Sequence, residues 1–421
     1  MLILKNGSIR QNGQFIKCDI ALQNDEICEI AASINAPTDA LVFDISNCVV
    51  LPGFEDAHVH LREPGFSYKE TIKSGCMSAA RGGYTLLCTM PNLKPVPDSY
   101  EHLKEQLDII ERDACIGVLP LGSVTVNEAG EELSDMEALA PYIIGYSDDG
   151  KGVQDSNLLK EAMIKAAKLN KPMMLHLEDM KLVNGGYVAD TEYLLSKGYK
   201  GICAASEYEP VKEAIRLAKE TGCHLHVCHI SCKESAEAIR QAKKDGIHVT
   251  CEVTPHHLIS TDKDVTDDAN WKMNPPLRSE EDRQALIAAL NDGTIDVIAT
   301  DNAPHSVEEK QKGLASSPFG IITNEYAFGL LYTNLVQTGL VSLDTLIEKM
   351  TTAMHILRNE DKAEVKVGAK ANLCVYNLDK KFVIETLHSI SQNCPYVGYE
   401  VCGENEMTIY EGNVIYQKGD E

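Results

Sequence analysis

Two histidines separated by one residue, His58 and His60, lie in the stretch Gly53–Gly65, shortly after the apolar run Val49–Leu51. This order of residues predicts a buried strand that runs out into a polar loop. Side chains alternate along a strand, so the two imidazoles point to the same side and can bind one metal ion. An H-x-H pair is a weak signal in a chain with 13 histidines. Its position at a strand end, beside Arg62, is what indicates a site.

Further metal-binding side chains follow later predicted strands. The fourth predicted strand runs into Asp149, the fifth reaches His176, the sixth ends at His229 and the eighth ends at Asp301. The carboxyl ends of barrel strands meet on one rim, so we expect these side chains to converge with the histidine pair. Four histidines and two carboxylates suit a pair of divalent ions that share a carboxylate and activate water.

These ligands need a scaffold of repeated strand–helix units. Strands are predicted at residues 54–60, 84–90, 115–120, 142–147, 173–178, 224–229, 247–253 and 295–301, with amphipathic helices at 68–81, 155–169, 209–220, 233–244 and 279–290 among the segments between them. Asp155 and Ser279 are good N-cap residues. Eight such units predict an α/β fold, a (β/α)8 TIM-type barrel. A doubly wound sheet is the alternative, but no G-x-G-x-x-G follows any strand.

Both ends of the chain differ from the middle because they are rich in short strands. Residues 1–50 alternate in polarity and contain the turn dipeptides Asn6-Gly7 and Asn12-Gly13. Apolar alternation returns near the other end, at residues 371–376, 407–410 and 414–416. We therefore expect a small composite β-sandwich domain built from residues 1–50 and 365–421, around a barrel of residues 51–364.

Composition excludes several classes of protein. The 421 residues carry a formal net charge of −24, which argues against nucleic acid or an anionic membrane as partner. The 14 cysteines are scattered and form no C-x-x-C pair, as is typical of reduced thiols. No signal peptide or membrane span is evident, so we expect a cytoplasmic protein.

Two other histidine groups and one polar segment have alternative interpretations. Alternation along residues 224–229 puts His229 on the opposite face from His224 and His226, and these two could form a separate zinc cluster with Cys223 and Cys228. We disfavour that cluster because adjacent residues of one strand point in opposite directions. His256-His257 is expected to support the site rather than bind metal. The polar segment 306–318 predicts either a solvated connector or a loop that orders around ligand.

Several of these motifs occur together and in order. The chain resembles the amidohydrolase superfamily and, within it, the dihydroorotase family of the longer bacterial type. The resemblance spans about residues 45–330 and rests on Asp56–Gly65, Met90–Asn92, Ser147–Gly150, Glu252–His257, Asn274–Arg278 and Asp301–His305.

The resemblance implies reversible hydrolysis of L-dihydroorotate to N-carbamoyl-L-aspartate in pyrimidine biosynthesis, with two zinc ions per chain. His58 and His60 would bind the more buried zinc, His176 and His229 the more exposed one, and Asp149 would bridge them. Asp301 would bind zinc and act as the catalytic proton shuttle. His60 would also contact the substrate, which would be held by Arg62, Asn92, Asn274, His305 and backbone groups of Phe319 and Gly320. A homodimer and association with aspartate transcarbamoylase are further expectations.

Two functional alternatives remain open. One is another cyclic amidase, of the hydantoinase or allantoinase type, which would use a carbamylated lysine as bridge; Lys151 is the candidate, and Asp148 is a second rival to Asp149. The other is a non-catalytic subunit, which should have lost metal ligands. The chain departs from the family pattern at Asn302, 323–325 and 351–355, and none of these positions removes a predicted ligand.

Overall fold

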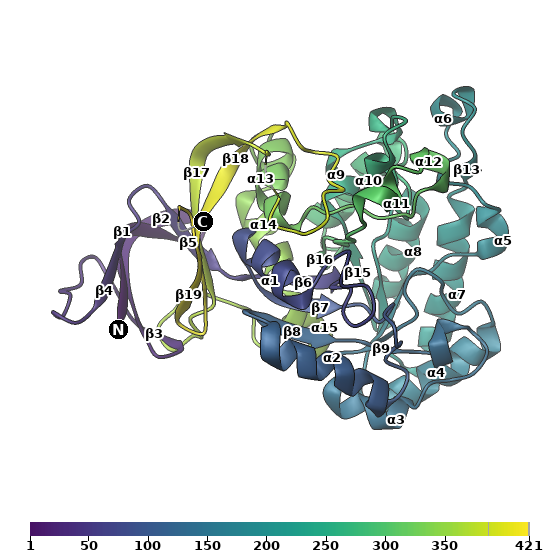
Figure 1. Ribbon diagram of the computed structural model, residues 1–421, viewed down its shortest axis with the longest axis horizontal. Coiled ribbons are helices and arrows are strands. Elements are labelled where there is room, and N and C mark those ends of the chain that lie inside the picture. The colour runs from purple at the N-terminus through teal and green to yellow at the C-terminus, as the bar shows by residue number, and fades with distance from the viewer. Residues whose placement is uncertain (386, 420–421) are drawn as a thin grey trace.

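The chain folds into an α/β body and a β-rich end that contains both termini (Figure 1). The computed structural model describes residues 1–385 and 387–419, so the predicted C-terminal segment is described except for residues 386, 420 and 421. The β-rich end is one eight-stranded sheet in the order β19-β18-β17-β5-β1-β2-β3, with β4 paired to β1. Its strands are β1 (Leu2–Gln11), β2 (Gln14–Gln23), β3 (Glu26–Ala31), β4 (Leu41–Asp44), β5 (Val49–Pro52), β17 (Leu373–Val383), β18 (Glu400–Tyr410) and β19 (Asn413–Gln417). Strands from both ends therefore pair as one sheet, where two stacked sheets were expected.

The α/β body is built on parallel strands. One group pairs as β6-β7-β8 and the other as β16-β15-β14-β11-β10-β9. Their bounds are β6 (Phe54–Val59), β7 (Tyr84–Thr89), β8 (Gly117–Pro120), β9 (Gly122–Ser123), β10 (Tyr146–Ser147), β11 (Met173–Leu175), β14 (Leu225–Val227), β15 (Val249–Val253) and β16 (Val297–Ile298). An isolated parallel bridge between Val59 and Asn302 links the chain after β16 to β6.

Helices connect these strands. The longer ones are α1 (Ile72–Arg81), α2 (Tyr100–Asp113), α4 (Ser156–Lys168), α7 (Ala205–Thr221), α8 (Lys233–Lys244), α10 (Glu280–Asn291) and α14 (Leu343–Met350). The shorter ones are α3 (Met136–Leu139), α5 (Met180–Val183), α6 (Glu192–Ser196), α9 (Pro255–Ile259), α11 (Val307–Lys310), α12 (Gly313–Ser316), α13 (Ala327–Leu331) and α15 (Ala353–Arg358). Two further strands, β12 (Val188–Ala189) and β13 (Gly201–Ile202), form a separate pair.

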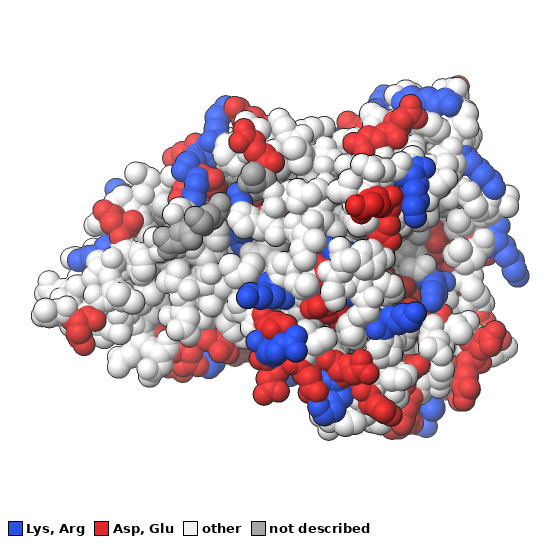
Figure 2. All heavy atoms as spheres, in the orientation of Figure 1, with Lys and Arg blue, Asp and Glu red and all other residues white. Residues whose placement is uncertain are grey.

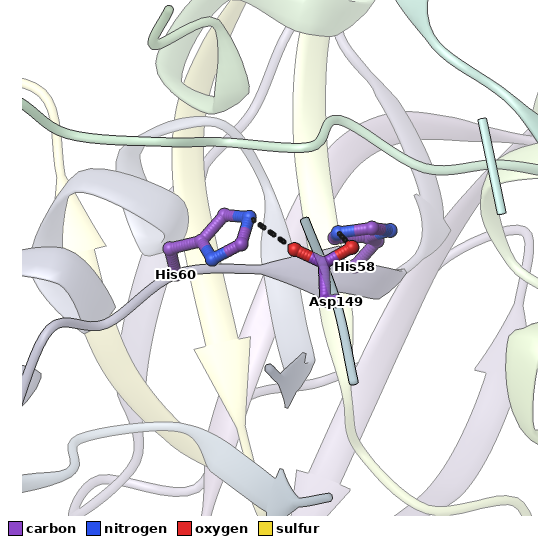
Figure 3. Close-up of side chains that lie close together, drawn as sticks. All are labelled: His58, His60 and Asp149. Atoms are coloured by element: carbon purple, nitrogen blue, oxygen red, sulfur yellow. Dashed lines mark ion pairs between the residues drawn. The ribbon is translucent and has the colours of Figure 1, made fainter. Parts of the chain in front are cut away.

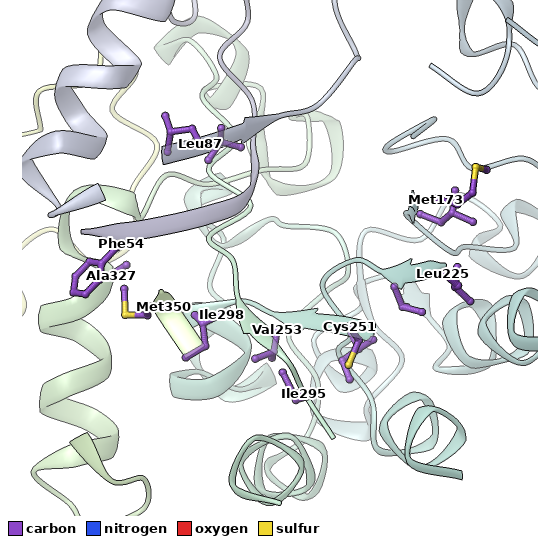
Figure 4. Close-up of a cluster of buried hydrophobic side chains, with 14 of the residues drawn as sticks. Phe54, Leu87, Met173, Leu225, Cys251, Val253, Ile295, Ile298, Ala327 and Met350 are labelled. Carbon is purple, nitrogen blue, oxygen red and sulfur yellow. The ribbon is translucent and has the colours of Figure 1, made fainter. Parts of the chain in front are cut away.

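A large apolar core lies between the parallel strands and their helices (Figure 4). It joins strand residues such as Phe54 and Ile298 to Ala327 of α13 and Met350 of α14, all of them buried. Close packing of this core fixes the position of each strand end, and therefore also the position of the polar side chains that follow it.

The predicted elements are confirmed with local differences. The helix expected at 68–81 begins at Ile72, because the Thr71 side chain accepts a hydrogen bond from Ser74 N and caps it. The strand expected at 142–147 is reduced to Tyr146–Ser147, because residues 140–142 form a 3-10 turn. Both differences leave more chain in the loops next to the strand ends.

The surface agrees with the negative net charge. On the face shown in Figure 2, acidic side chains gather around α2 and no comparably large group of basic side chains is visible. No helix in the described ranges is long and apolar enough to cross a membrane. The 14 cysteines, all within the described residues, are free thiols, and most are buried.

Candidate metal centre and active site

A cavity of about 240 Å³ lies at the carboxyl ends of the parallel strands. Every site residue predicted from the sequence lines this cavity except His58, which is fully buried beneath it. The lining residues are His60, Arg62, Asn92, Asp149, Gly150, His176, His229, Asn274, Asp301, Ala303, His305, Phe319 and Gly320.

Asp149 lies at the centre of the cluster. Its Oδ1 is 3.5 Å from His58 Nε2 and its Oδ2 is 3.6 Å from His60 Nε2, so the carboxylate lies between the two imidazoles (Figure 3). On its other side, Oδ1 is 3.8 Å from His229 Nε2 and 4.0 Å from His176 Nδ1. Two groups of potential ligands, His58 with His60 and His176 with His229, therefore share Asp149.

Asp301 completes the cluster from the end of the last parallel strand. Its Oδ1 lies 3.0 Å from His60 Nε2 and 3.4 Å from His58 Nε2. The carboxylate is close to the histidine pair and also lines the cavity. Asp301 can therefore face both a metal held by His58 and His60 and a molecule in the cavity.

Two buried polar atoms of this cluster have no hydrogen-bond partner among the described residues, and a metal ion would bind both. His58 Nε2 and Asp149 Oδ1 are buried and have no hydrogen-bond partner. His176 Nδ1 and His229 Nε2 face each other at 3.0 Å, a distance at which one ring must donate if no cation lies nearby. Buried unpaired polar atoms are costly, and a divalent cation between nitrogen and carboxylate ligands would satisfy them.

Other side chains fix the orientation of the histidines. Glu252 Oε1 accepts a hydrogen bond from His58 Nδ1 at 2.7 Å, which leaves His58 Nε2 free to face Asp149. Asn92 Oδ1 accepts from His60 Nδ1 at 2.9 Å, and Glu178 Oε2 lies 3.3 Å from His176 Nε2. Partners of this kind set the tautomer of metal-binding histidines. Sequence reasoning assigned no role to Glu252 or Glu178; the signal for Glu178 was its position two residues after His176.

The two rivals of Asp149 are engaged elsewhere. Asp148 Oδ1 accepts hydrogen bonds from the backbone N–H groups of Val124 and Thr125, so this carboxylate ties the loop to the preceding strand. The Lys151 side chain is 59% exposed, and its Nζ lies 3.7 Å from Glu128 Oε2. Neither residue lines the cavity. The geometry favours Asp149 as the shared carboxylate.

Three site residues have left-handed backbone. The φ angles are 63° at Arg62, 33° at His229 and 49° at Asp301. Side chains other than glycine rarely adopt this region, and such conformations concentrate at functional sites. His229 therefore leaves the alternation of β14, which ends at Val227. The expectation that His229 and His226 lie on opposite faces is wrong: His226 Nε2 lies 3.1 Å from Glu252, the partner of His58, while the His229 ring is centred 5.1 Å from that of His58.

Among the described residues, His224 and His226 are not grouped with Cys223 and Cys228 as potential metal ligands. His224 Nε2 and His226 Nδ1 each lie 2.8 Å from Thr250 Oγ1, so this pair is joined by a hydroxyl and not by a zinc cluster with Cys223. His257 bonds to Thr254 and, through Nε2, to the Pro275 carbonyl at 3.0 Å, next to Asn274. His257 thus supports the loop that carries Asn274, as expected.

Arg62 is a buried cation without a direct ion-pair partner, although the carboxylates of Asp301, Asp149 and Glu309 lie close enough to oppose the lowering of its pKa by burial. It is 8% exposed, and within the described part of the chain no carboxylate lies within 4.0 Å of its guanidinium. Its Nε donates to the Pro304 carbonyl at 3.1 Å, and Nη2 lies 3.4 Å from His305 Nε2. The carboxylate of the next residue, Glu63, accepts from Ile72 N at 2.8 Å. The cavity therefore offers a ligand a guanidinium that has no direct carboxylate partner.

The pKa values of the titratable side chains differ between the two sides of the cavity. Burial would raise the pKa of Asp149, but His58 and His229 hold it well below its usual range. Burial and the neighbouring Arg62 and Lys69 cations hold the pKa of His305 well below its usual value, so this imidazole is neutral. Burial also lowers the pKa of Arg62 to about 10, which still leaves it charged at neutral pH.

The backbone of Gly320 is already bonded within the protein. Its N–H donates to the Lys272 carbonyl at 2.9 Å, and its carbonyl accepts from Lys310 Nζ at 2.8 Å and from Asn393 Nδ2 at 3.1 Å. Its φ is 127°, and a Cβ there would lie 2.7 Å from that of Ala303. The absence of a side chain at Gly320 thus lets its backbone lie close to Ala303 in the cavity wall. The Gly320 N–H and carbonyl are both bonded within the protein, and a role of the Phe319 and Gly320 backbone in binding the substrate stays a prediction.

The neighbouring segment 306–318 is more ordered than its composition predicts. It contains α11 and α12, and Ser306 and Glu309 form a capping box at the start of α11. Lys310 and Leu314 are buried. The two short helices were not expected from the composition, and Lys310 folds inward to bond the carbonyls of Pro318 and Gly320. Whether the segment is a solvated connector or orders around a ligand stays a prediction.

Comparisons with known proteins agree with this geometry. A family model described as dihydro-orotase-like matches residues 47–235. A dihydroorotase from Fusobacterium nucleatum is 45% identical over 100% of this chain and 99% of its own length, and one from Staphylococcus epidermidis is 44% identical over 99% and 100%. Among solved structures, the L-hydantoinase (dihydropyrimidinase) of Arthrobacter aurescens superposes with a TM-score of 0.87 at 23% identity, over 100% of this chain and 96% of that one. The D-hydantoinase of a Thermus species gives 0.85 at 24%, with the same coverage. At this identity, the solved structures indicate a shared fold.

Proposed function

The chain belongs to the dihydroorotase family, and from this premise we propose that it interconverts L-dihydroorotate and N-carbamoyl-L-aspartate at a centre for two zinc ions. The reaction is a step of pyrimidine biosynthesis. The observation that carries the proposal is the buried, unpaired guanidinium of Arg62 in the same cavity as the histidine and aspartate cluster.

The residues that would hold the two ions follow from the shared carboxylate. His58 and His60 would hold one and His176 and His229 the other, with Asp149 common to both and Asp301 beside the first. When bound, the ions supply Lewis acidity, which polarises the amide carbonyl and lowers the pKa of water. The unpaired buried atoms of His58 and Asp149 support this assignment.

Asp301 is the residue proposed to move the proton. It lines the cavity and lies beside His60, so its carboxylate can accept a proton from water on one side and deliver it to the ring nitrogen of the substrate on the other. Burial would raise its pKa, but His58 and His60 hold it below the usual range, so the carboxylate begins ionised. That is the state a general base requires.

The opposite wall is proposed to hold the substrate. Arg62 would bind the carboxylate of dihydroorotate with two parallel hydrogen bonds, and neutral His305, whose Nε2 accepts from the guanidinium, would hold Arg62 in place. Asn92 and Asn274 line the cavity at its other edges, with Phe319 and Gly320 closing it. A carboxylate-binding wall separates this proposal from the general cyclic amidase, whose substrate hydantoin has no carboxylate.

The other interpretations receive less support. A carbamylated lysine would be expected of a hydantoinase-type site, but the exposed Lys151 lies beside Glu128 and outside the cavity. A non-catalytic subunit is disfavoured because all six predicted ligands converge.

Closure of the parallel strands into an eight-stranded barrel is supported by the Val59–Asn302 bridge, and we propose residues 51–364 as that barrel. The composite terminal domain, the homodimer, the transcarbamoylase association and the cytoplasmic location stay predictions.

One experiment tests the proposal directly. The purified chain is assayed with dihydroorotate, hydantoin and allantoin side by side, and the metal content of the same sample is measured. We expect turnover of dihydroorotate to exceed the others and about two zinc ions per chain. A preference for hydantoin or allantoin would overturn the assigned substrate, and a single tightly held ion would overturn the two-ion centre.

A further inference from the structure

A side chain from the C-terminal part of the sequence bonds to the wall of the substrate cavity from outside. Asn393 lies between β17 and β18, in a segment that leaves the terminal sheet and runs over the α/β body beside α9 (Figure 1). Cys394 and Tyr396 of this segment pack in an apolar cluster with Trp271 and Ile321. The segment is therefore anchored next to the cavity, although Asn393 does not line it.

The Asn393 amide joins three residues that do line the cavity. Its Nδ2 donates to the Ala303 carbonyl at 3.0 Å and to the Gly320 carbonyl at 3.1 Å, and its Oδ1 accepts from His305 N at 3.1 Å. Asn393 is 2% exposed, so no water competes for these bonds. Its two amide hydrogens and its amide oxygen are all used.

These bonds connect two separate stretches of chain. Ala303 and His305 follow the last parallel strand, whereas Gly320 lies beyond α11 and α12. The backbones of these stretches are joined by Ala303 N, which donates to the Ile321 carbonyl at 2.8 Å, and by the bridge from Asn302 to Ile321. The amide of Asn393 thus sets the distance between the His305 side and the Gly320 side of the pocket.

We propose that Asn393 is a positioning residue for substrate binding, which acts by fixing His305 and the Gly320 wall opposite Arg62. This inference rests on the proposed function. Asn393 contacts no predicted metal ligand, so its effect should appear in the binding of the substrate rather than in the chemistry at the metal centre. Lys310 holds the same Gly320 carbonyl from the other side, which explains why the wall itself should persist when Asn393 is removed.

The chain offers a matched control in Asn405 of β18. Asn405 is also buried, and its Nδ2 donates to the backbone carbonyls of Ala80 and Arg81 at 3.3 and 3.0 Å, neither of which lines the cavity. Asn405→Ala therefore removes a similar set of buried amide hydrogen bonds without touching the pocket. A loss of stability common to both variants can be separated from a change in substrate binding.

The test compares the zinc-loaded wild-type chain, Asn393→Ala, Asn393→Ser and Asn405→Ala. For each, kcat and KM for dihydroorotate, zinc content and the urea midpoint of unfolding are measured. We expect Asn393→Ala to raise KM about 10-fold while kcat changes less than about threefold, with zinc content unchanged. Asn393→Ser keeps one hydroxyl donor and should give an intermediate KM. Asn405→Ala should lower the urea midpoint and leave KM unchanged.

A KM within about twofold of wild type in Asn393→Ala overturns the positioning role, as does an equal rise in KM in Asn405→Ala. If Asn393→Ala does not fold, Asn393→Ser decides by the same criterion. A wild-type chain that does not turn over dihydroorotate overturns the proposed function, and this inference with it. Active wild type with unaffected Asn393 variants overturns the inference alone.

Discussion

The first prediction concerns Arg62, because its guanidinium is buried in the cavity and makes few contacts within the protein. Arg62 is 8% exposed, and within the described residues its side chain makes hydrogen-bond contacts to the Pro304 carbonyl and the His305 ring alone. A charge-assisted hydrogen bond contributes roughly 1.5–3 kcal/mol, and each 1.4 kcal/mol is about tenfold in kcat/KM. Arg62→Met should therefore lower kcat/KM for dihydroorotate by about 10-fold to 100-fold.

The assay is steady-state turnover of dihydroorotate with zinc content measured on the same preparation. Zinc content should not change, because Arg62 is not among the predicted ligands. Arg62→Lys keeps the charge but cannot form two parallel bonds to one carboxylate, so its kcat/KM should lie between those of wild type and Arg62→Met. This ordering distinguishes a lost carboxylate contact from a general disturbance of the loop.

Two results would refute the reasoning. Normal turnover of dihydroorotate by Arg62→Met would show that the substrate carboxylate is bound elsewhere. A parallel loss of zinc would show that Arg62 maintains the metal centre instead of the substrate pocket. Either result would make the general cyclic amidase the better interpretation of the cavity.

Three further predictions concern the metal centre and the core. Asp301→Asn keeps a neutral oxygen ligand but cannot accept a proton, so turnover should fall about 100-fold or more while most zinc remains; near-normal turnover would assign the proton to another group. Lys151→Met should leave activity and its independence of bicarbonate unchanged, because Asp149 provides the shared carboxylate; a bicarbonate requirement in the wild-type chain would contradict this. Burial raises the pKa of Glu55 to about 7. Between about pH 4.5 and 7 the native state therefore binds more protons than the unfolded state, and the free energy of unfolding falls as pH rises through that window. Glu55→Gln should therefore show a smaller drop in urea midpoint between about pH 5 and pH 8 than wild type, and an identical drop would count against a neutral Glu55.

Much of the site could be predicted from local sequence patterns. The apolar run before His58 and the ligands at later strand ends depend on strand periodicity, which is a property of neighbouring residues. The convergence of those residues follows from the rule that parallel strands present their carboxyl ends at one edge. The residues predicted to form the site indeed line or underlie one cavity. Their roles in binding and catalysis stay predictions.

Other features depended on contacts between residues far apart in the chain. Asp148 and Asp149 are adjacent and alike in sequence, and they differ only because Val124 and Thr125 approach one and the histidines approach the other. The left-handed backbone at His229 could not be read from strand alternation, because alternation assumes extended backbone.

The sequence by itself determined the strand ends, the histidine pair and the strand-rich termini, since each of these is encoded in a short stretch of residues. Only the tertiary structure decided that Glu252 orients His58 and that Asn393 joins both sides of the pocket. Glu252 is 194 residues from His58, and Asn393 is 90 from Ala303. No local pattern records such pairs, because a hydrogen bond between distant segments forms only after the packed core has brought their backbones together.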